Sequence, residues 1–305
     1  RMTGFLEPSI SYSSDGLDFM IPYFKVLSKE SDITLAARNI SERGAGLEGN
    51  FRKLHGLNSN LTNVDFLYFD SDKEYEKLYG TSASNRWAFG LKDKYQFNQN
   101  IRVNVDWSKA SDSLVLRDIT GEISSIGSER KQSLNQNITL EAVYENFILK
   151  IEQQKNQSLN PLLTNGYSKS PSIDLEFSKN LGSFAIYEYL NITNFKASEL
   201  HGFYGNKKSN KYLVNLDEIT EGSRIYSDFR IVTNKYFSKA HLQSSFGIKS
   251  IKYNLRDDIK TKNVNVPNFK LIISSMFIKK VNMDKHIIKP SLTYGFVDYK
   301  DQENN

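Results

Sequence analysis

The fold is decided by the stretch Thr-Leu-Glu-Ala-Val-Tyr-Glu-Asn-Phe-Ile-Leu-Lys-Ile-Glu at residues 139–152. A two-residue turn at Glu145 and Asn146 would pair Tyr144 with Phe147 and then step outward along two antiparallel strands. The pairs then sort by polarity, with Ala142–Leu149 and Leu140–Ile151 on one side and Glu141–Lys150 and Thr139–Glu152 on the other. This agreement of register and polarity predicts a hairpin with one face toward lipid and one toward water. We expect Glu141 and Lys150 to be cross-strand neighbours on the watery side.

The same two-residue alternation recurs along most of the chain, whereas helical periodicity is nearly absent. In residues 101–107, Ile101, Val103, Val105 and Trp107 alternate with Arg102, Asn104 and Asp106. In residues 172–177, Ile173, Leu175 and Phe177 alternate with Ser172, Asp174 and Glu176. We count about fifteen such segments, many of them roughly 9 to 11 residues long, which is the length of a strand that crosses a membrane. In the strand at 183–192, Glu188 falls among Phe184, Ile186 and Leu190, so either the register shifts there or Glu188 lies near an interface.

The connections between these segments alternate between short and long. Short turns are expected at 97–100, 145–146, 179–182, 233–239 and 281–285, and long polar stretches at 71–84, 111–130, 157–170, 198–221 and 254–266. A soluble sandwich has no reason to keep this order, whereas a transmembrane barrel has short periplasmic turns and long outer loops. The sequence therefore predicts an all-β fold, an antiparallel transmembrane β-barrel.

A barrel of this kind encloses a wet lumen, which must hold water, a plug or a partner. The polar candidates to line it are Arg102, Asn104, Asp106, Glu141, Lys150, Asp174 and Glu176. They could guide sugar and phosphate groups, although a plain solvated face explains them equally well. Aromatic residues expected at the membrane boundaries are Trp87, Trp107, Tyr144 and Phe147. The alternative is that the two tryptophans are core residues of a soluble sheet.

Composition excludes several other classes of protein. The 305 residues include no Cys, which rules out a disulfide scaffold, a cysteine-based zinc site and a cysteine nucleophile. The net charge of +5 is too small and too dispersed to indicate a nucleic-acid partner. No apolar run approaches the roughly 18 to 20 residues that a transmembrane helix needs.

Catalytic motifs are also weak. The four histidines, His55, His201, His241 and His286, show no metal-ligand spacing, and no cofactor motif is present. His241 and Ser245 share one strand face and faintly suggest a membrane hydrolase, but residues four apart on a strand lie some 13 Å apart. Lys207, Lys208 and Lys211 could meet lipid phosphates, although solvated loop residues explain them better. We therefore expect no enzyme and no metal or cofactor.

Several short segments, taken in order, resemble the opening barrel segment of the lipopolysaccharide-assembly family LptD (also called OstA or Imp). They are Gly4–Ser13, Ile21–Phe24, Asp32–Thr34, Arg43–Gly44, Leu47–Arg52, Asn85–Trp87, Asn104–Asp112 and Tyr299–Gln302. Each segment alone is weak, and the ordered set is fairly specific. Between about 120 and 285 the resemblance is mainly one of pattern.

The resemblance implies a barrel of about 26 strands, of which residues 1–305 would be the first part, preceded by a periplasmic jellyroll domain that this chain lacks. It implies a place in the Gram-negative outer membrane, where the protein assembles lipopolysaccharide into the outer leaflet by lateral release through a barrel seam. The implied partners are lipopolysaccharide, outer-membrane lipids, an LptE-like lipoprotein plug in the lumen, and an LptA-like periplasmic bridge reached through the missing domain. No nucleic acid is expected.

Two prolines carry an independent physical argument about the seam. Pro8 and Pro22 lie inside strand-like stretches, and each removes a possible ladder hydrogen bond because proline has no N–H. By resemblance they match the gate prolines of the family. The alternative is that both are ordinary edge or bulge prolines. An outer-membrane diffusion pore remains a second interpretation of the whole chain, since it needs the same alternation but neither seam prolines nor a plug.

Overall fold

The computed structural model describes residues 2–56, 60–80, 84–123, 126, 132–160, 165–197, 221–256, 262–281 and 284–298. The chain divides into two compact units. Unit 1 comprises residues 1–141, 152–170 and 196–219, and unit 2 comprises 142–151, 171–195 and 220–305. Among the described residues, no helix is both long enough and apolar enough to span a membrane.

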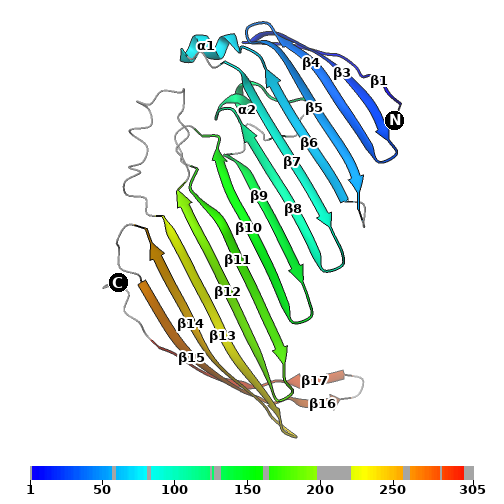
Figure 1. Cartoon of the computed structure of the whole chain (residues 1–305). Coiled ribbons are helices and arrows are strands. Elements are labelled where there is room, and N and C mark those ends of the chain that lie inside the picture. The colour runs from blue at the N-terminus through cyan, green and yellow to red at the C-terminus, as the bar shows by residue number, and fades with distance from the viewer. Residues whose placement is uncertain are drawn as a thin grey trace. The chain divides into compact units, whose positions relative to one another are not determined.

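Antiparallel strands that follow one another in sequence make up most of the described chain (Figure 1). Their hydrogen-bonded order is β1-β3-β4-β5-β6-β7-β8-β9-β10-β11-β12-β13-β14-β15-β18, with β2 also paired to β3. This confirms the predicted all-β antiparallel fold.

The strands of unit 1 are β1 (Gly4–Phe5), β2 (Ser9–Ser13), β3 (Gly16–Ser28), β4 (Ser31–Ile40), β5 (Gly44–His55), β6 (Asn60–Phe69), β7 (Arg86–Gln96) and β8 (Ile101–Ala110). The strands that contribute residues to both units are β9 (Ser133–Val143), β10 (Phe147–Ser158), β11 (Tyr167–Asn180) and β12 (Phe184–Ala197). The remaining strands, in unit 2, are β13 (Gly222–Tyr236), β14 (His241–Leu255), β15 (Lys262–Ser274), β16 (Phe277–Val281), β17 (Asp284–Ile288) and β18 (Ser291–Val297).

In unit 1 the two faces of the sheet differ because side chains alternate along each strand. The register pairs Tyr68 of β6 with Trp87 of β7, and Phe66 with Phe89, so these rings share one face. The neighbouring positions Leu67 and Ala88 pair on the opposite face, where both are buried. We call this second face the loop-bearing face, because the segment that follows β8 folds back onto it.

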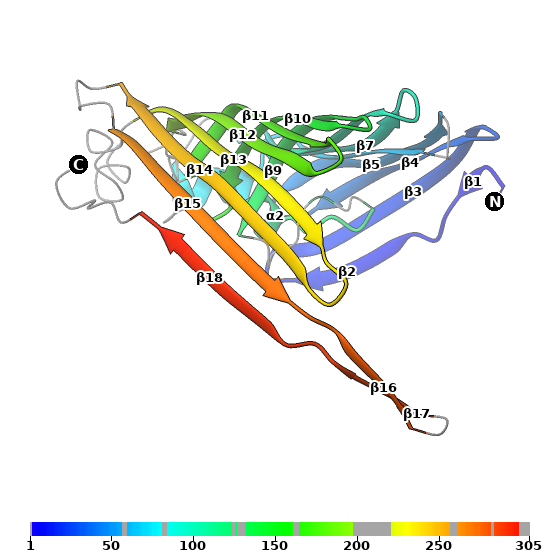
Figure 2. The same ribbon diagram turned by 90° about the horizontal axis from the view of Figure 1, so that it is seen from below.

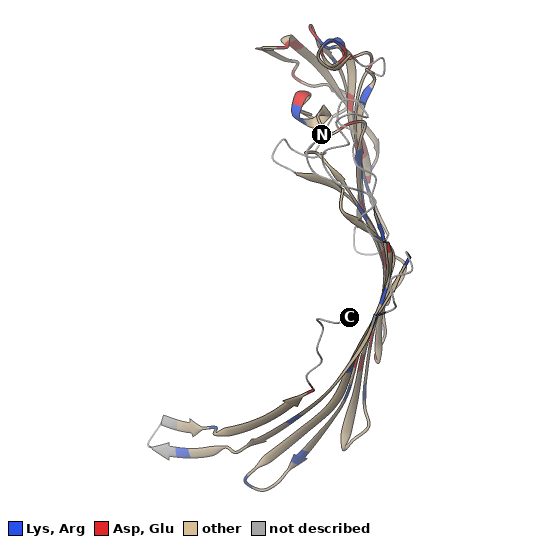
Figure 3. Cartoon of the chain, turned by 90° about the vertical axis from the view of Figure 1, so that its left-hand side faces the viewer, with Lys and Arg blue, Asp and Glu red and all other residues tan. Residues whose placement is uncertain are grey.

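The segment after β8 was predicted as a polar loop, and this prediction is incomplete. Residues 111–126 include the short helix α2 (Val115–Asp118), which Figure 3 shows beside the sheet. Its apolar side chains bury against strands of unit 1 in a cluster of Ile40, Leu67, Phe69, Ala88, Ala110, Val115, Leu116, Ile119, Ile126 and Leu134. Ile126 lies so close to β7 that a Cβ atom on Gly90 would be 3.1 Å from its Cγ1. Part of the face expected to be wet is therefore covered by the chain itself.

The predicted polar stretch at 71–84 contains a second helix, α1 (Lys73–Tyr79). Its ends follow the usual capping rules. The Asp72 carboxylate accepts from the Tyr75 N–H at 3.0 Å, and Gly80 ends the helix in the left-handed conformation with φ of 59°.

In unit 2 the strands β12, β13, β14 and β15 pair along nearly their whole length. The strands β16 and β17 form a separate two-stranded sheet, which continues beyond the ends of β15 and β18 (Figure 2). The predicted turn at 281–285 includes Val281 and Asp284, which form the last described pair of this hairpin.

Most predicted turns agree with the structure, and several boundaries differ, including β11, which begins at Tyr167 within the stretch expected at 157–170. β7 ends at Gln96 and β8 begins at Ile101, as expected for the 97–100 turn. β13 continues to Tyr236, so the turn expected at 233–239 is shorter and spans residues 237–240. β15 already begins at Lys262, inside the stretch expected to be a long loop. The polar residues at the end of β13 and at the start of β15 belong to strands because they form backbone pairs with β14.

Candidate functional site

The first strand of unit 1 is interrupted, and the interruption contains a predicted gate residue. β1 pairs with β3 through Phe5–Tyr23, and β2 pairs with the same strand through Ser9–Met20. Between these two pairs, three residues on the first strand (6–8) oppose two on β3 (21–22), which is a bulge of one residue. Pro8 lies in this bulge, immediately before β2.

Pro22 lies on β3 opposite the same interruption. Its carbonyl accepts a hydrogen bond from the Leu6 N–H at 2.9 Å, so its backbone polar group is directed toward the first strand. In a regular antiparallel ladder the N–H of that residue would be directed the same way. Proline has no N–H, so the pairing of β3 with the first strand lacks one hydrogen bond. The β3–β4 ladder, in which Pro22 pairs with Ala36, loses no bond.

A buried ion-pair cluster lies on the loop-bearing face next to this strand. Arg38 of β4 donates to both carboxylate oxygens of Asp18 at 2.9 and 2.6 Å, and it also donates to Glu48. The Glu48 side chain is fully buried and that of Arg38 is only 4% exposed. The same guanidinium donates to the carbonyl of Thr120 at 2.7 Å, which ties the loop to the strands.

A second cluster closes the end of unit 1 near α1 and α2. Arg86 donates to Asp72, Asp112 and Asp118 at 2.8 to 3.0 Å, and its side chain is 1% exposed. Its guanidinium also stacks on the Tyr75 ring, 4.3 Å from the centroid. Figure 3 marks the charged residues on α2 beside the sheet. Because removal of one partner would leave uncompensated buried charge, this cluster fixes the position of α2.

Arg43 joins this second cluster through an ion pair with Asp72 at 3.0 Å, and burial and charge shift the pKa values of several residues in the cluster. Burial alone would raise the pKa of Asp112, but the hydrogen bonds and charge of Arg86 outweigh it and hold that pKa below its ordinary value. Burial would lower the pKa of Arg43, but hydrogen bonding to Asp15 and the nearby carboxylates raise it. Burial raises the pKa of the Tyr75 phenol to about 12.

Four of the predicted polar lumen candidates belong to unit 1. Arg102 forms a two-pronged ion pair with Glu141, at 2.7 and 3.0 Å. Asp106 accepts from the Asn135 side chain at 3.2 Å, and Asn104 pairs in register with Lys94. They lie on the same face as Ala110, which belongs to the buried cluster, so they extend the loop-bearing face beyond the part that α2 covers. Their role in a lumen stays a prediction.

The other polar candidates belong to unit 2. Asp174 accepts hydrogen bonds from the Tyr189 hydroxyl and the Asn191 amide, both at 2.7 Å. Glu176 is exposed beside an open pocket of about 600 Å³. Lys150 also belongs to this unit, and its predicted pairing with Glu141 stays a prediction because Glu141 belongs to unit 1.

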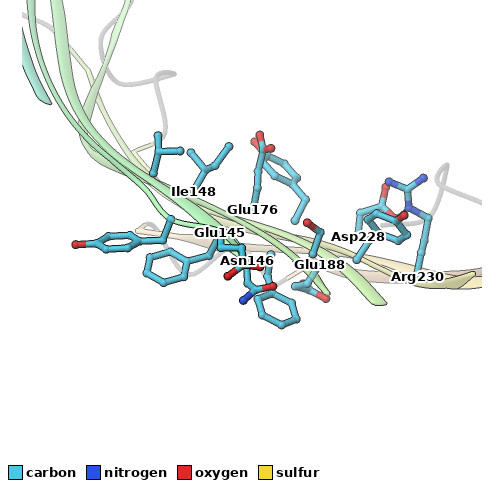
Figure 4. A pocket seen from close by; sticks show the side chains of 14 residues that line it. Glu145, Asn146, Ile148, Glu176, Glu188, Asp228 and Arg230 are labelled. Atoms are coloured by element: carbon cyan, nitrogen blue, oxygen red, sulfur yellow. Dashed lines mark ion pairs between the residues drawn. The ribbon is translucent and has the colours of Figure 1, made fainter. Parts of the chain in front are cut away.

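Figure 4 shows how the sides of the sheet differ at this pocket. Glu176, Asp228 and Arg230 extend from one face, and Glu188 extends from the opposite face. The β12 register is regular through Glu188, which pairs with Phe229. Glu188 therefore lies on the same face as its apolar neighbours, and it accepts a hydrogen bond from Ser227 at 2.7 Å. The irregular polarity of this strand therefore reflects a carboxylate on the otherwise apolar face and not a shift of register.

The predicted boundary aromatics have well-defined positions in their strands. The Tyr144 N–H donates to the Phe147 carbonyl at 2.8 Å, and the two rings stack 4.9 Å apart, as the two-residue turn requires. Trp87 pairs with Tyr68, and the Trp107 ring meets that of Phe89 at 6.0 Å. Their place at a membrane boundary stays a prediction.

The residues of the hydrolase alternative do not come together in the described part of the chain. The His241 ring stacks on Tyr236 and lies 3.3 Å from the Asn234 side chain, whereas Ser245 pairs with Val232. No group of His, Asp and Glu residues with metal-site geometry occurs among the described residues. His201 and the lysines at 207, 208 and 211 lie outside them.

Sequence reasoning did not predict either ion-pair cluster. The signal was present in the segments that carry the family resemblance, because Arg43, Glu48, Arg86 and Asp112 come from four of them. Both clusters therefore contain residues from different segments of the family resemblance. Of these four charged residues, only Glu48 and Arg86 lie within strands, and they were the local clue.

Comparison with known proteins identifies the family. The family model described as LptD, LPS transport system D, matches residues 84–305. The chain belongs to the LptD family. This membership confirms the predicted family and the predicted place in the Gram-negative outer membrane.

Relatives in the LptD family are distant in sequence. The LPS-assembly protein LptD of Salmonella choleraesuis is 25% identical over 310 residues, which cover 99% of this chain and 38% of that protein. The LptD of Legionella pneumophila strain Philadelphia 1 is 30% identical over 172 residues, which cover 53% of this chain and 20% of that protein. The chain thus spans well under half the length of these relatives.

Solved structures give a weaker likeness. OmpT of Vibrio cholerae, an outer membrane protein, is 7% identical, with 97% of this chain and 85% of that chain covered and a TM-score of 0.34. A porin is 10% identical, with 96% and 99% covered and a TM-score of 0.28. Both TM-scores are below 0.5, so these likenesses bear on neither the site nor the function.

Proposed function

We propose that this chain is the first part of an LptD barrel that assembles lipopolysaccharide into the outer leaflet by lateral release through a seam beside its first strand. The relatives named LPS-assembly protein supply the substrate class. The observation that carries the proposal is the interrupted pairing of the first strand with β3, at Pro8 and Pro22.

The physical argument concerns the strength of one strand pairing. Each hydrogen bond in a ladder contributes about 0.5–1.5 kcal/mol, so a strand that lacks bonds at a bulge separates more easily than its neighbours. By contrast, the adjoining β4–β5 ladder pairs ten consecutive residues on each strand without a register shift. A seam formed at the first strand would therefore separate before the other strand pairs, such as β4–β5, do.

The partners are part of the same proposal. An LptE-like lipoprotein would occupy the lumen against polar residues such as Arg102, Asp106 and Glu141, and an LptA-like bridge would deliver lipopolysaccharide from the periplasm. Asn104, Lys150, Asp174 and Glu176 are the further residues we assign to the wetted surface. The family description is one of transport, so we propose no catalytic step.

The test is a double substitution in the full protein. Pro8→Ala together with Pro22→Ala restores two N–H donors and should tighten the first strand, which slows delivery of lipopolysaccharide to the cell surface and raises sensitivity to large antibiotics. Pro267→Ala is the matched control, because Pro267 also lies within a strand, β15, but pairs with Ile248 in unit 2. Normal surface lipopolysaccharide in the double variant would contradict the seam. Steady ion conductance of the full protein together with its plug would indicate a diffusion pore instead.

A further inference from the structure

The loop that folds onto unit 1 also reaches the interrupted first strand. The Ser9 hydroxyl of β2 donates to the Glu122 carboxylate at 2.9 Å, across 113 residues of sequence. Ser9 is the first residue of β2, directly after Pro8. The contact therefore joins the loop to the strand at the point where the ladder to β3 resumes.

The other side of this loop segment is anchored in the buried cluster. Glu48 of β5 accepts hydrogen bonds from the backbone N–H groups of Glu122 and Ile123 at 3.0 and 3.1 Å. The carbonyl of Thr120 accepts from Arg38. Because Glu48 is fully buried and paired with Arg38, it holds these amides in a fixed place.

We propose that the segment of residues 120–123 is a latch that holds β2 to the body of unit 1 and must release Ser9 before a seam at the first strand can open. Its fixed part is Glu48 with Arg38, and its movable part is the exposed contact between Ser9 and Glu122. The inference rests on the proposed function only in that the seam at the first strand is taken to open. The coupling of loop and strand stands on the contacts themselves.

The latch predicts different effects for substitutions on its two sides. Ser9→Ala removes the donor on the strand and leaves the loop in place. Glu122→Ala removes the acceptor, whereas Glu122→Gln keeps a carbonyl oxygen that can still accept. Glu48→Gln weakens the anchor and should loosen both the loop and the strand. Agreement between Ser9→Ala and Glu122→Ala, with partial rescue by Glu122→Gln, is the specific signature of the latch.

The experiment measures amide hydrogen exchange of residues 9–13 in the full protein with its plug, in lipid nanodiscs. We expect Ser9→Ala and Glu122→Ala to speed this exchange roughly three- to tenfold, as loss of one hydrogen bond of ordinary net strength would do, because the contact is exposed to solvent. Ser11→Ala is the matched control, because Ser11 lies two residues along the same strand face and the described residues include no partner for its hydroxyl. It should leave the exchange unchanged.

A parallel assay separates the latch from the proposed function. Lipopolysaccharide delivery is measured in cells for the same variants and for the double proline variant. Unchanged exchange in both Ser9→Ala and Glu122→Ala would overturn the latch, whatever delivery does. Faster exchange with normal delivery, in a protein whose delivery also ignores the proline substitutions, would support the latch and overturn the seam.

Discussion

Gly46 of β5 lies directly opposite Phe69 of β6, and a Cβ atom on Gly46 would be 2.5 Å from the Phe69 ring. The ring belongs to the buried cluster beneath the loop and has no room to move, since Phe69 is fully buried. The glycine is therefore required for close packing of the ring across the strand pair.

The first prediction follows from this contact. Gly46→Ala should destabilise the full protein by about 1–3 kcal/mol, because it overpacks a site without free space. The measurement is the urea midpoint of the barrel in detergent. Gly4→Ala is the control, since an added Cβ there would meet nothing within 4 Å. An equal midpoint for the two variants would show that Phe69 can move after all.

The second prediction compares a buried and an exposed arginine with similar geometry. Arg86 and Arg102 both form two-pronged pairs with a carboxylate at 2.7 to 3.0 Å, but their side chains are 1% and 55% exposed. Arg86→Gln should cost about 3–5 kcal/mol in the free energy of unfolding, whereas Arg102→Gln should cost less than about 1 kcal/mol. Similar losses would mean that burial does not set the strength of these pairs.

The third prediction concerns pH. The pKa of Asp112 is held below its ordinary value of 3.8, so its pairing stabilises the fold above that pH and is lost as pH falls through the lowered pKa. Asp112→Asn should therefore cost about 2–3 kcal/mol at pH 7, and the difference from the unmodified protein should shrink below pH 3.8. Unfolding is followed at both pH values. A constant difference would exclude the carboxylate charge as its cause.

The fourth prediction tests the apolar contact of the loop. Ile119 is 1% exposed within the buried cluster, whereas Leu78 on α1 is 59% exposed. Ile119→Ala should cost about 2–4 kcal/mol through the cavity it leaves, and Leu78→Ala almost nothing. Limited proteolysis between residues 111 and 132 should speed up only in the first variant. Equal cutting would mean that the loop is held by its ion pairs alone.

The strands were predictable from sequence because their alternation is a local signal. Ile101 to Trp107 and the turn between Tyr144 and Phe147 appear as expected. The covered face was not predicted, because the apolar residues Val115 and Ile119 are interspersed with charged ones in a stretch that looked like solvent. The ion pairs were not predictable either. Arg38 finds Thr120 across 82 residues, and local patterns hold no information on such pairings.

The bulge at the first strand also decides which way its residues face. Phe5 pairs with Tyr23 and Ile10 with Phe19, so an odd-numbered and an even-numbered residue present their apolar side chains to the same side. Ser9 can reach Glu122 for the same reason. If residues 5–10 paired with β3 without a bulge, Phe5 and Ile10 would lie on opposite faces because they are five residues apart, and one of the two would turn toward water. The number of residues in this short connection therefore determines which face each side chain takes, as much as the identity of the residues does.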